Sequence, residues 1–172
     1  FTSEIDYTNH IITVVFPYNY PKLSDNVLQT SDLKKMRVIA DLDNNVYVYP
    51  TLLFMDMTKD NYITVKDQTG TSTEYKVVAE IRKSNECTIT KFNLTSLGLS
   101  GIINESTKTI SLISLESIGE VLADVSISHG ATISPDPTTV ALNYDQDQKV
   151  TVTAQNGTTK STYTVKKEIP EK

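Results

Sequence analysis

A pattern of residues occurs twice in this chain of 172 residues. The first copy covers residues 63–81 and the second covers residues 150–169. In each copy, alternating apolar and polar residues flank a polar turn that contains a glycine, Gly70 or Gly157. Such alternation around a glycine turn is typical of a β-hairpin. The repeat therefore predicts two similar domains, each ending in a hairpin and each large enough for a modest hydrophobic core.

The beginnings of the two halves also match. Ile12 and Val14 follow a polar turn in the first half, and Ile110 and Leu112 follow a similar turn in the second. This alternation predicts an early strand in each half, with every second side chain facing a core. The residues that we expect to be buried at equivalent positions are Ile12, Val14, Val65, Val77, Ile110, Leu112, Val152 and Val165.

Short segments rich in β-branched residues, separated by turn residues, fill most of the chain. This spacing is typical of β-sandwiches and not of β-α-β units. We therefore predict an all-β protein made of two tandem immunoglobulin-like antiparallel β-sandwich domains, residues 1–86 and 87–172, with an extra loop at 17–32 in the first. Residues 88–94 read as the opening strand of the second domain. Because the first half has no equivalent, we expect its opening strand to lie upstream of Phe1 or to be truncated.

Composition excludes several classes of function. The 16 basic and 21 acidic residues give a net charge of -5, opposite in sign to a nucleic-acid-binding surface, so no nucleic-acid partner is expected. Cys87 is the only cysteine, which excludes intrachain disulfides and any metal site built from several cysteines. No apolar run is long enough to span a bilayer as a helix.

Nucleophilic catalysis by serine or cysteine usually requires a positioned histidine. The only histidines, His10 and His129, lie in different halves, and each adjoins a predicted turn. The sequence contains neither Gly-x-Ser-x-Gly nor His-Glu-x-x-His. Two facing carboxylates, as in glycosidases, are the remaining alternative, although acidic residues in loops are more often solvated charges. We therefore expect the chain not to be an enzyme.

Three oxygen-bearing residues, Asp41, Asp43 and Asn45, alternate in a predicted loop of the first half. Oxygen ligands at alternate positions can wrap a calcium ion, so these residues are the candidate metal ligands and calcium is the one cofactor considered. The EF-hand pattern fails, because Leu52 stands where that loop requires a glutamate. An Asx-rich turn explains the same residues. Asn45 aligns with Gly130, which predicts a turn with positive φ at this position.

Tyrosine is the most abundant aromatic residue, with nine tyrosines, four phenylalanines and no tryptophan. Carbohydrate sites commonly stack an aromatic ring on a sugar and surround it with polar groups. The candidate ligand-binding residues are Tyr18, Asn19 and Tyr20 in the extra loop, and Tyr47 and Tyr49 in a predicted strand. Alternation places the last two on one face of that strand and the valines beside them on the other. Ordinary cross-strand tyrosine pairing, or burial under the extra loop, is the alternative.

The stretch Gly130–Pro135, the hairpin segment Val152–Thr158 and the return strand Tyr163–Val165 resemble immunoglobulin-like or cadherin-like domains of Bacteroidetes surface lipoproteins. The first half resembles them only in its hairpin and its first strand. The resemblance implies an extracytoplasmic, lipid-anchored protein of the cell surface or outer membrane. It also implies that the anchor lies upstream of this chain and makes its only membrane contact.

The same resemblance implies a role in adhesion or glycan handling. We expect a non-catalytic surface module with an adhesive or spacer role, whose partner is a surface polysaccharide or another surface protein. The alternative is a glycan-binding protein of a polysaccharide-utilisation system that uses the tyrosines of domain one. We expect any specificity to reside in domain one, because the halves differ most at residues 17–32 and 41–49.

Overall fold

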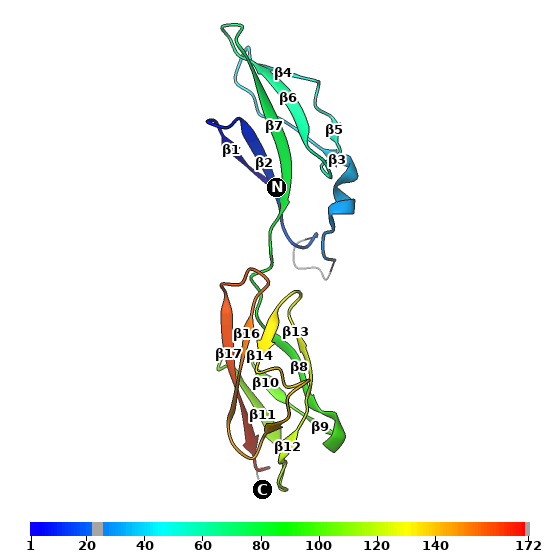
Figure 1. Cartoon of the computed structure of the whole chain (residues 1–172), viewed down its shortest axis with the longest axis vertical. Helices are drawn as coiled ribbons and strands as arrows, with labels where there is room; N and C mark the ends of the chain where they lie inside the picture. Colours follow the sequence, from blue (N-terminus) through cyan, green and yellow to red (C-terminus); the bar gives the residue numbers. More distant parts are fainter. Residues whose placement is uncertain (22–25, 171–172) are drawn as a thin grey trace. The chain divides into compact units, whose positions relative to one another are not determined.

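The computed structural model describes residues 1–21 and 26–170, and these form β-strands joined by turns and short 3-10 helices (Figure 1). The chain divides into two compact units, Phe1–Lys83 (unit 1) and Ser84–Lys172 (unit 2). The prediction of an all-β protein with two domains is confirmed. The division falls after Lys83, close to the predicted one after residue 86.

Unit 1 contains a five-stranded sheet and a separate pair of short strands. The sheet order is β1-β2-β7-β6-β4, and the pair is β3-β5. The bounds are β1 Thr2–Asp6, β2 Ile11–Phe16, β3 Met36–Arg37, β4 Tyr47–Tyr49, β5 Phe54–Met55, β6 Asn61–Lys66 and β7 Ser72–Ile81, with the 3-10 helix η1 at Thr30–Lys35.

Unit 2 repeats this arrangement and adds a third sheet. Its five-stranded sheet has the order β10-β11-β17-β16-β14, its pair is β12-β15, and its additional sheet is β13-β8-β9. The bounds are β8 Ile89–Leu94, β9 Leu99–Ser100, β10 Ile102–Asn104, β11 Thr109–Ile113, β12 Glu120–Val121, β13 Asp124–Ile127, β14 Thr132–Ser134, β15 Leu142–Asn143, β16 Gln148–Thr153 and β17 Lys160–Glu168, with the 3-10 helix η2 at Thr95–Leu97.

The repeated hairpins form because each turn provides hydrogen-bond acceptors and a glycine. In the β6–β7 turn, Asp67 Oδ1 accepts hydrogen bonds from the amides of Thr69 (2.8 Å) and Thr71 (2.9 Å), and Gly70 has a φ of 89°. In the β16–β17 turn, Asn156 Oδ1 accepts hydrogen bonds from the amides of Thr158 (3.0 Å) and Thr159 (3.0 Å), and Gly157 has a φ of 77°. Glycine adopts this left-handed conformation without steric cost, which favours the closing of both predicted hairpins.

One strand pair in each unit is parallel, which corrects the prediction of wholly antiparallel sheets. β2 pairs with β7 in parallel, with Ile12 opposite Val77, and β11 pairs with β17 in parallel, with Ile110 opposite Val165. A parallel pair requires a long connection, and the chain between these strands builds β3 to β6 in unit 1 and β12 to β16 in unit 2. The sequence correctly predicted these four segments as strands. Alternation within a strand, however, carries no information about the direction of the neighbouring strand.

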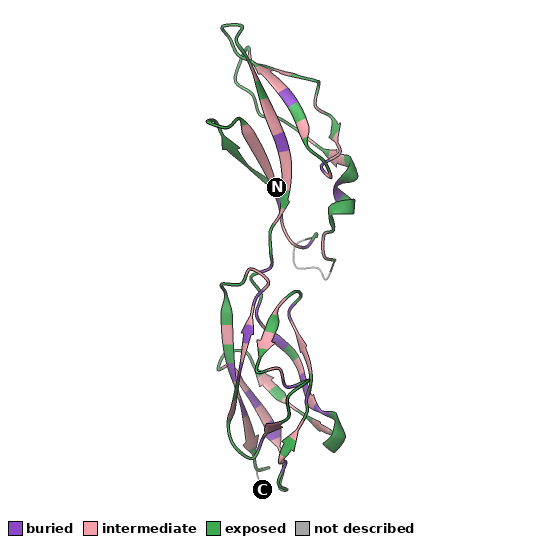
Figure 2. Ribbon diagram, viewed as in Figure 1, coloured by how far each residue is buried: buried purple, intermediate pink, exposed green. Residues whose placement is uncertain are grey.

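The two cores differ in completeness (Figure 2). The eight residues expected to be buried all face a core, but only five are fully buried. All four in unit 2 are buried, whereas in unit 1 Val77 is buried and Ile12, Val14 and Val65 are only partly buried. β8 accounts for the difference, because its Ile89, Phe92 and Leu94 belong to the core of unit 2. The described residues of unit 1 include no equivalent of β8.

Candidate binding surfaces

Three exposed tyrosines lie on neighbouring strands at one edge of the unit 1 sheet. Tyr47 and Tyr49 come from β4 and are 65% and 76% exposed, and Tyr62 comes from β6 and is 55% exposed. In the antiparallel register Tyr49 lies opposite Thr64, which places Tyr62 on the diagonal of the same face. Diagonal neighbours are within reach of aromatic side chains. We call these three residues the tyrosine face.

The sequence predicted part of this face. Tyr47 and Tyr49 do share one side of β4, and Val48 between them packs against the core on the other side. Tyr62 was missed, although its alternation with the buried Ile63 places it on the outer side of β6. Whether these tyrosines bind a ligand stays a prediction.

The other candidate residues, Tyr18, Asn19 and Tyr20, lie elsewhere. They form one arm of a narrow loop in which the amide of Leu28 donates to the carbonyl of Tyr18 (2.9 Å) and Asn19 forms a bridge with Val27. Asn19 is buried, and Tyr20 is exposed with its ring 5.4 Å from that of Phe1. Part of this predicted loop, residues 22–25, lies outside the described residues.

The five candidates therefore do not form one site. The ring of Phe1 also contacts Phe16, which pairs with Ile81 at the end of β7, so Tyr20 lies near that end. Tyr47 pairs with Lys66, beside the turn at the start of β7. The ten residues of β7 separate the two groups, and a strand of that length spans about 30 Å.

The predicted calcium ligands lie in an exposed turn. Asp41, Asp43 and Asn45 are all exposed, the amide of Val46 donates to the carbonyl of Asp43 (3.2 Å), and Asn45 has a φ of 62°. Gly130 has a φ of 67°, so the prediction of a left-handed turn residue at both positions is confirmed. Within residues 1–21 and 26–170, no group of three or more His, Cys, Asp or Glu side chains could hold a metal ion. Calcium binding at this turn stays a prediction.

Asp145 joins a loop of unit 2 to the β15–β16 turn. Its carboxylate accepts hydrogen bonds from the Ser117 hydroxyl and from the amides of Ile118 (2.9 Å) and Gly119 (3.0 Å), and Lys167 Nζ lies 3.3 Å away. The hydrogen bond from Ser117, followed by that from the Ile118 amide, holds the pKa of this carboxyl well below its usual range. The side chain therefore fixes loop geometry as an anion.

A second polar cluster connects β17 to β8 and to the β10–β11 turn. Tyr163 Oη donates to Glu105 Oε1 (2.6 Å) and accepts a hydrogen bond from the amide of Ile89 (3.2 Å), while Lys108 Nζ contacts Glu105 and lies 3.3 Å from Tyr163 Oη. Burial, supported by the bond to Glu105, raises the pKa of Tyr163. Burial acts to raise the pKa of Glu105, but its bonds to Lys108 and Tyr163 outweigh burial, so this pKa is lowered.

His10, His129 and Cys87 each have different neighbours. The His10 ring lies 5.3 Å from the ring of Tyr75 in unit 1, and His129 is exposed in a turn of unit 2. Cys87 is buried, with its Sγ 3.1 Å from the hydroxyl of Ser161. Tyr75 and Tyr163 occupy the same repeated position, as the hairpin alignment predicted.

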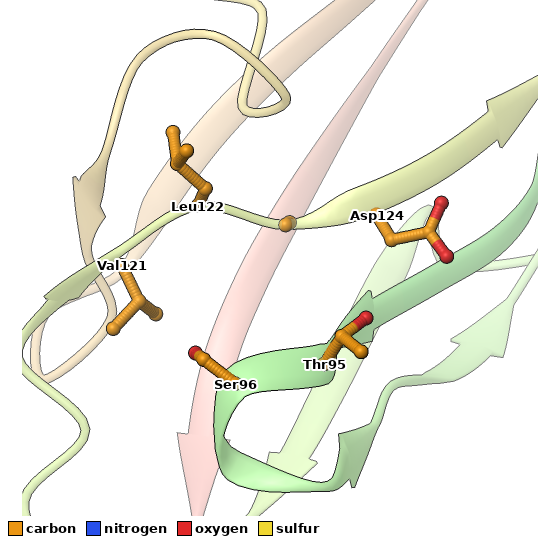
Figure 3. Close-up of a pocket in the computed structure, with 6 residues that line it drawn as sticks. Thr95, Ser96, Val121, Leu122 and Asp124 are labelled. Carbon is orange, nitrogen blue, oxygen red and sulfur yellow. The ribbon is translucent and has the colours of Figure 1, made fainter.

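A pocket in unit 2 has a volume of about 400 Å³ (Figure 3). Thr95 and Ser96 line one side, and the segment 121–124 lines the other. Its one carboxylate, Asp124, lies 2.8 Å from Lys91 Nζ, so its charge is already paired. The lining offers two hydroxyl groups for a ligand.

Over the described part of the chain, no helix has both the length and the apolar character needed to cross a membrane.

Two family models match the chain, each over less than half of its length. Residues 1–79 match a domain of unknown function (DUF5018), and residues 89–167 match a second domain of unknown function (DUF8499). The first match falls in unit 1 and the second in unit 2. No curated protein matches the chain.

Three solved structures from Bacteroides species are similar in part. A candidate glycoside hydrolase from Bacteroides thetaiotaomicron shares 27% identity over 53% of this chain, with a TM-score of 0.44. A DUF4623 family protein from Bacteroides eggerthii shares 18% over 49% (TM-score 0.35), and a candidate secreted protein from Bacteroides fragilis shares 15% over 65% (TM-score 0.33). The chain covers 27%, 22% and 90% of these proteins, so it spans about a quarter of the first two.

Proposed function

We propose that this chain is a non-catalytic module that acts outside the cytoplasm, on a bacterial surface, in adhesion or as a spacer. The observation that carries the proposal is that carboxylates of this chain hold turns and loops in place through hydrogen bonds. Four aspartates accept hydrogen bonds from turn or loop amides and have pKa values below their usual range: Asp6, Asp56, Asp67 and Asp145.

These carboxylates are suited to holding turns. A general acid at neutral pH requires a carboxyl group whose pKa is raised, so that it still carries a proton. Among the described residues, the carboxyls whose pKa is shifted, including that of Glu105, all have a lowered pKa. The location rests on the resemblance of Gly130–Pro135 and the closing hairpins to domains of Bacteroidetes surface lipoproteins.

Adhesion and catalysis can be tested with the same purified chain. The fluorescently labelled chain would be incubated with bacterial cells and with soluble polysaccharides, and retention on cells and release of reducing ends would both be measured. Retention without release supports adhesion, and neither retention nor release supports a spacer. Release of reducing ends that is lost on substitution of one carboxylate would show that the protein is a hydrolase and would refute the proposal.

The tyrosine face favours a second candidate function, which is glycan binding. Three exposed rings on adjacent strands offer a platform on which sugar rings can stack, and the face carries hydrogen-bonding groups such as Thr64 and Lys66 beside them. Affinity gels containing different polysaccharides would be compared for the parent chain, Tyr47→Ala, Tyr49→Ala and Tyr62→Ala. Tyr7→Ala is the matched control, because Tyr7 is 71% exposed in the β1–β2 turn, away from this face.

Glycan binding through the face predicts that each of the three substitutions reduces retardation in the gel by a factor of several, while the control leaves it unchanged. Retardation that survives all three substitutions would exclude the tyrosine face as the binding surface.

A further inference from the structure

A small pocket adjoins the tyrosine face in unit 1. Its volume is about 230 Å³, and Tyr62, one of the three residues of that face, lines it. Val38, the segment 50–56, Lys59 and Asn61 form the rest of the lining. Pockets that enclose a whole drug-sized ligand have volumes of roughly 300–1,000 Å³. This one is smaller, so it is suited to a single substituent of a sugar whose ring lies on Tyr62.

One part of the lining is apolar. Val38, Leu53, Phe54 and Met55 belong to this part. Lys35 Nζ lies 4.9 Å from the centre of the Phe54 ring, a cation-π contact that restrains the ring. The substituents of an unmodified hexose are hydroxyl groups, and burying a hydroxyl without a hydrogen bond is unfavourable. A substituent that carries a methyl group is instead stabilised when it is buried there.

Asn61 gives the pocket a fixed hydrogen-bond acceptor. Its Nδ2 donates to the backbone carbonyls of Asp56 and Lys59, both at 2.8 Å. Both N–H groups of the side chain are thereby used, whereas Oδ1 accepts no hydrogen bond from a described residue. The side-chain nitrogen of Gln148, at the equivalent position of unit 2, is held by two backbone carbonyls in the same way. A ligand that fits this pocket therefore brings an N–H or O–H donor.

The charges of the lining offset each other. They belong to Asp56 and Lys59, whose Oδ2 and Nζ lie 3.8 Å apart. Asp56 Oδ1 also accepts hydrogen bonds from the amide (3.1 Å) and the hydroxyl (2.6 Å) of Thr58. A carboxylate or sulfate on the ligand would meet the carboxylate of Asp56 and the acceptor of Asn61, and it has no proton to donate to either. The pocket thus favours a neutral substituent.

We propose that this pocket binds the acetamido group of an N-acetylated amino sugar whose ring stacks on Tyr62. The group has an N–H that donates to Asn61 Oδ1, a carbonyl that accepts from the Thr51 hydroxyl, and a methyl group for the apolar part of the lining. Unit 2 has Lys149 at the position of Tyr62 and therefore offers no ring there. The inference rests on the second candidate function, glycan binding by the tyrosine face, and it names the class of sugar.

The test uses the full chain and four methyl β-glycosides. The isotopically labelled chain would be titrated, with NMR detection, with the glycosides of N-acetylglucosamine and N-acetylgalactosamine. Those of glucose and galactose are the matched sugars without the acetamido group. We expect the acetamido sugars to shift the side-chain amide of Asn61 and the methyl groups of Leu53 and Met55, with dissociation constants of about 1–10 mM. The hexoses should bind at least about tenfold more weakly, because they leave the apolar part of the pocket unfilled.

Three variants separate stacking from recognition of the acetamido group. Tyr62→Ala should weaken binding of all four sugars, because it removes the ring on which they stack. Leu53→Asn should weaken only the acetamido sugars, by about fivefold or more, so that the preference for them is reduced. Ile39→Asn is the matched control and should bind as the parent does. Ile39 is 78% exposed, against 59% for Leu53, and it does not line the pocket.

The outcomes that would overturn this proposal differ from those that would overturn glycan binding. Equal binding of acetamido sugars and hexoses, with shifts at Tyr62, would refute recognition of the acetamido group and leave glycan binding in place. A preference for acetamido sugars that persists unchanged in Leu53→Asn would also refute it. So would the absence of shifts with all four sugars at about 50 mM, well above the expected dissociation constants, and the affinity gels would then decide on glycan binding alone. Retained chemical-shift dispersion in each variant confirms that it is folded.

Discussion

The hydroxyl of Tyr163 accepts a hydrogen bond from the backbone amide of Ile89 at 3.2 Å, and it thereby connects the last strand of unit 2 to β8. Tyr163 is fully buried in the core. The same hydroxyl donates to Glu105 at 2.6 Å, so one side chain satisfies groups from two separate segments. Tyr75 has the repeated position in unit 1, where its ring instead contacts His10.

This relationship predicts that Tyr163→Phe destabilises unit 2. The substitution leaves the Ile89 amide without its acceptor, and an unsatisfied buried group costs about 1–3 kcal/mol. Urea unfolding followed by amide resonances of unit 2 would measure the change. Tyr75→Phe is the matched control and should alter the stability of unit 1 by less than about 0.5 kcal/mol. An equal loss in both variants would mean that the Ile89 contact is not the cause.

Asp145→Asn should change how the stability of unit 2 depends on pH. The folded carboxyl has a lowered pKa, so its stabilisation is present above the unfolded value of about 4 and is lost as the pH falls below it. The variant should be less stable at pH 7 and should lose less stability between about pH 4 and pH 2 than the parent. Urea midpoints measured across this range test the prediction.

Asp147→Asn serves as the control for that measurement. Asp147 is exposed and lies 3.8 Å from Lys166 Nζ, a surface pair of the kind that contributes little. If Asp147→Asn flattens the acid decline as much as Asp145→Asn does, general charge reduction is responsible and not the loop contact.

Tyr144→Phe should stabilise unit 2. Tyr144 is buried with its ring 6.0 Å from that of Phe92, and no described residue forms a hydrogen bond with its hydroxyl. Removing an unsatisfied hydroxyl avoids a desolvation cost, so we expect a gain of about 1 kcal/mol in the free energy of unfolding. A loss of stability would indicate that an ordered water satisfies this group.

The same residue predicts a difference at alkaline pH. Burial raises the pKa of Tyr144 to about 12. Below the unfolded pKa of about 10, Tyr144 is neutral in both the folded and the unfolded state, so pH does not affect stability through this group. As the pH rises from about 10 toward 12, the unfolded state ionises first, and the folded state loses stability. In Tyr144→Phe, the urea midpoint should fall less at alkaline pH than in the parent. Tyr7→Phe, at an exposed position, should show the same decline as the parent.

Gly101→Ala should disrupt the contact between β8 and the start of β10. A Cβ at this position would lie 2.8 Å from the Phe92 carbonyl oxygen and 2.7 Å from Cγ2 of Ile110, and the Gly101 amide donates to that carbonyl at 2.7 Å. Because the backbone must move, we expect a loss of more than about 2 kcal/mol in urea unfolding. Gly119→Ala, which meets open space at a φ of 69°, should cost only about 1 kcal/mol.

The sequence predicted those features that depend on local pattern. Turn residues and alternation placed the two hairpins, the buried Val77 and Val165 and the left-handed Asn45 correctly. They did not reveal that Tyr20 and Tyr47 lie at opposite ends of β7, because this depends on pairing between distant segments. The contact between Ile89 and Tyr163, 74 residues apart, likewise has no local signature.

The parallel pairs have a mechanical consequence. In unit 2 the early strand β11 and the last strand β17 lie side by side and run in the same direction over five residue pairs. A pulling force applied at the start of β11 and at the end of β17 would drag these strands past each other along their length. Their hydrogen bonds would then share the load and rupture together, instead of opening one at a time as in a zipper. The parallel pair thus acts as a shear clamp, and β2 and β7 provide the same clamp in unit 1.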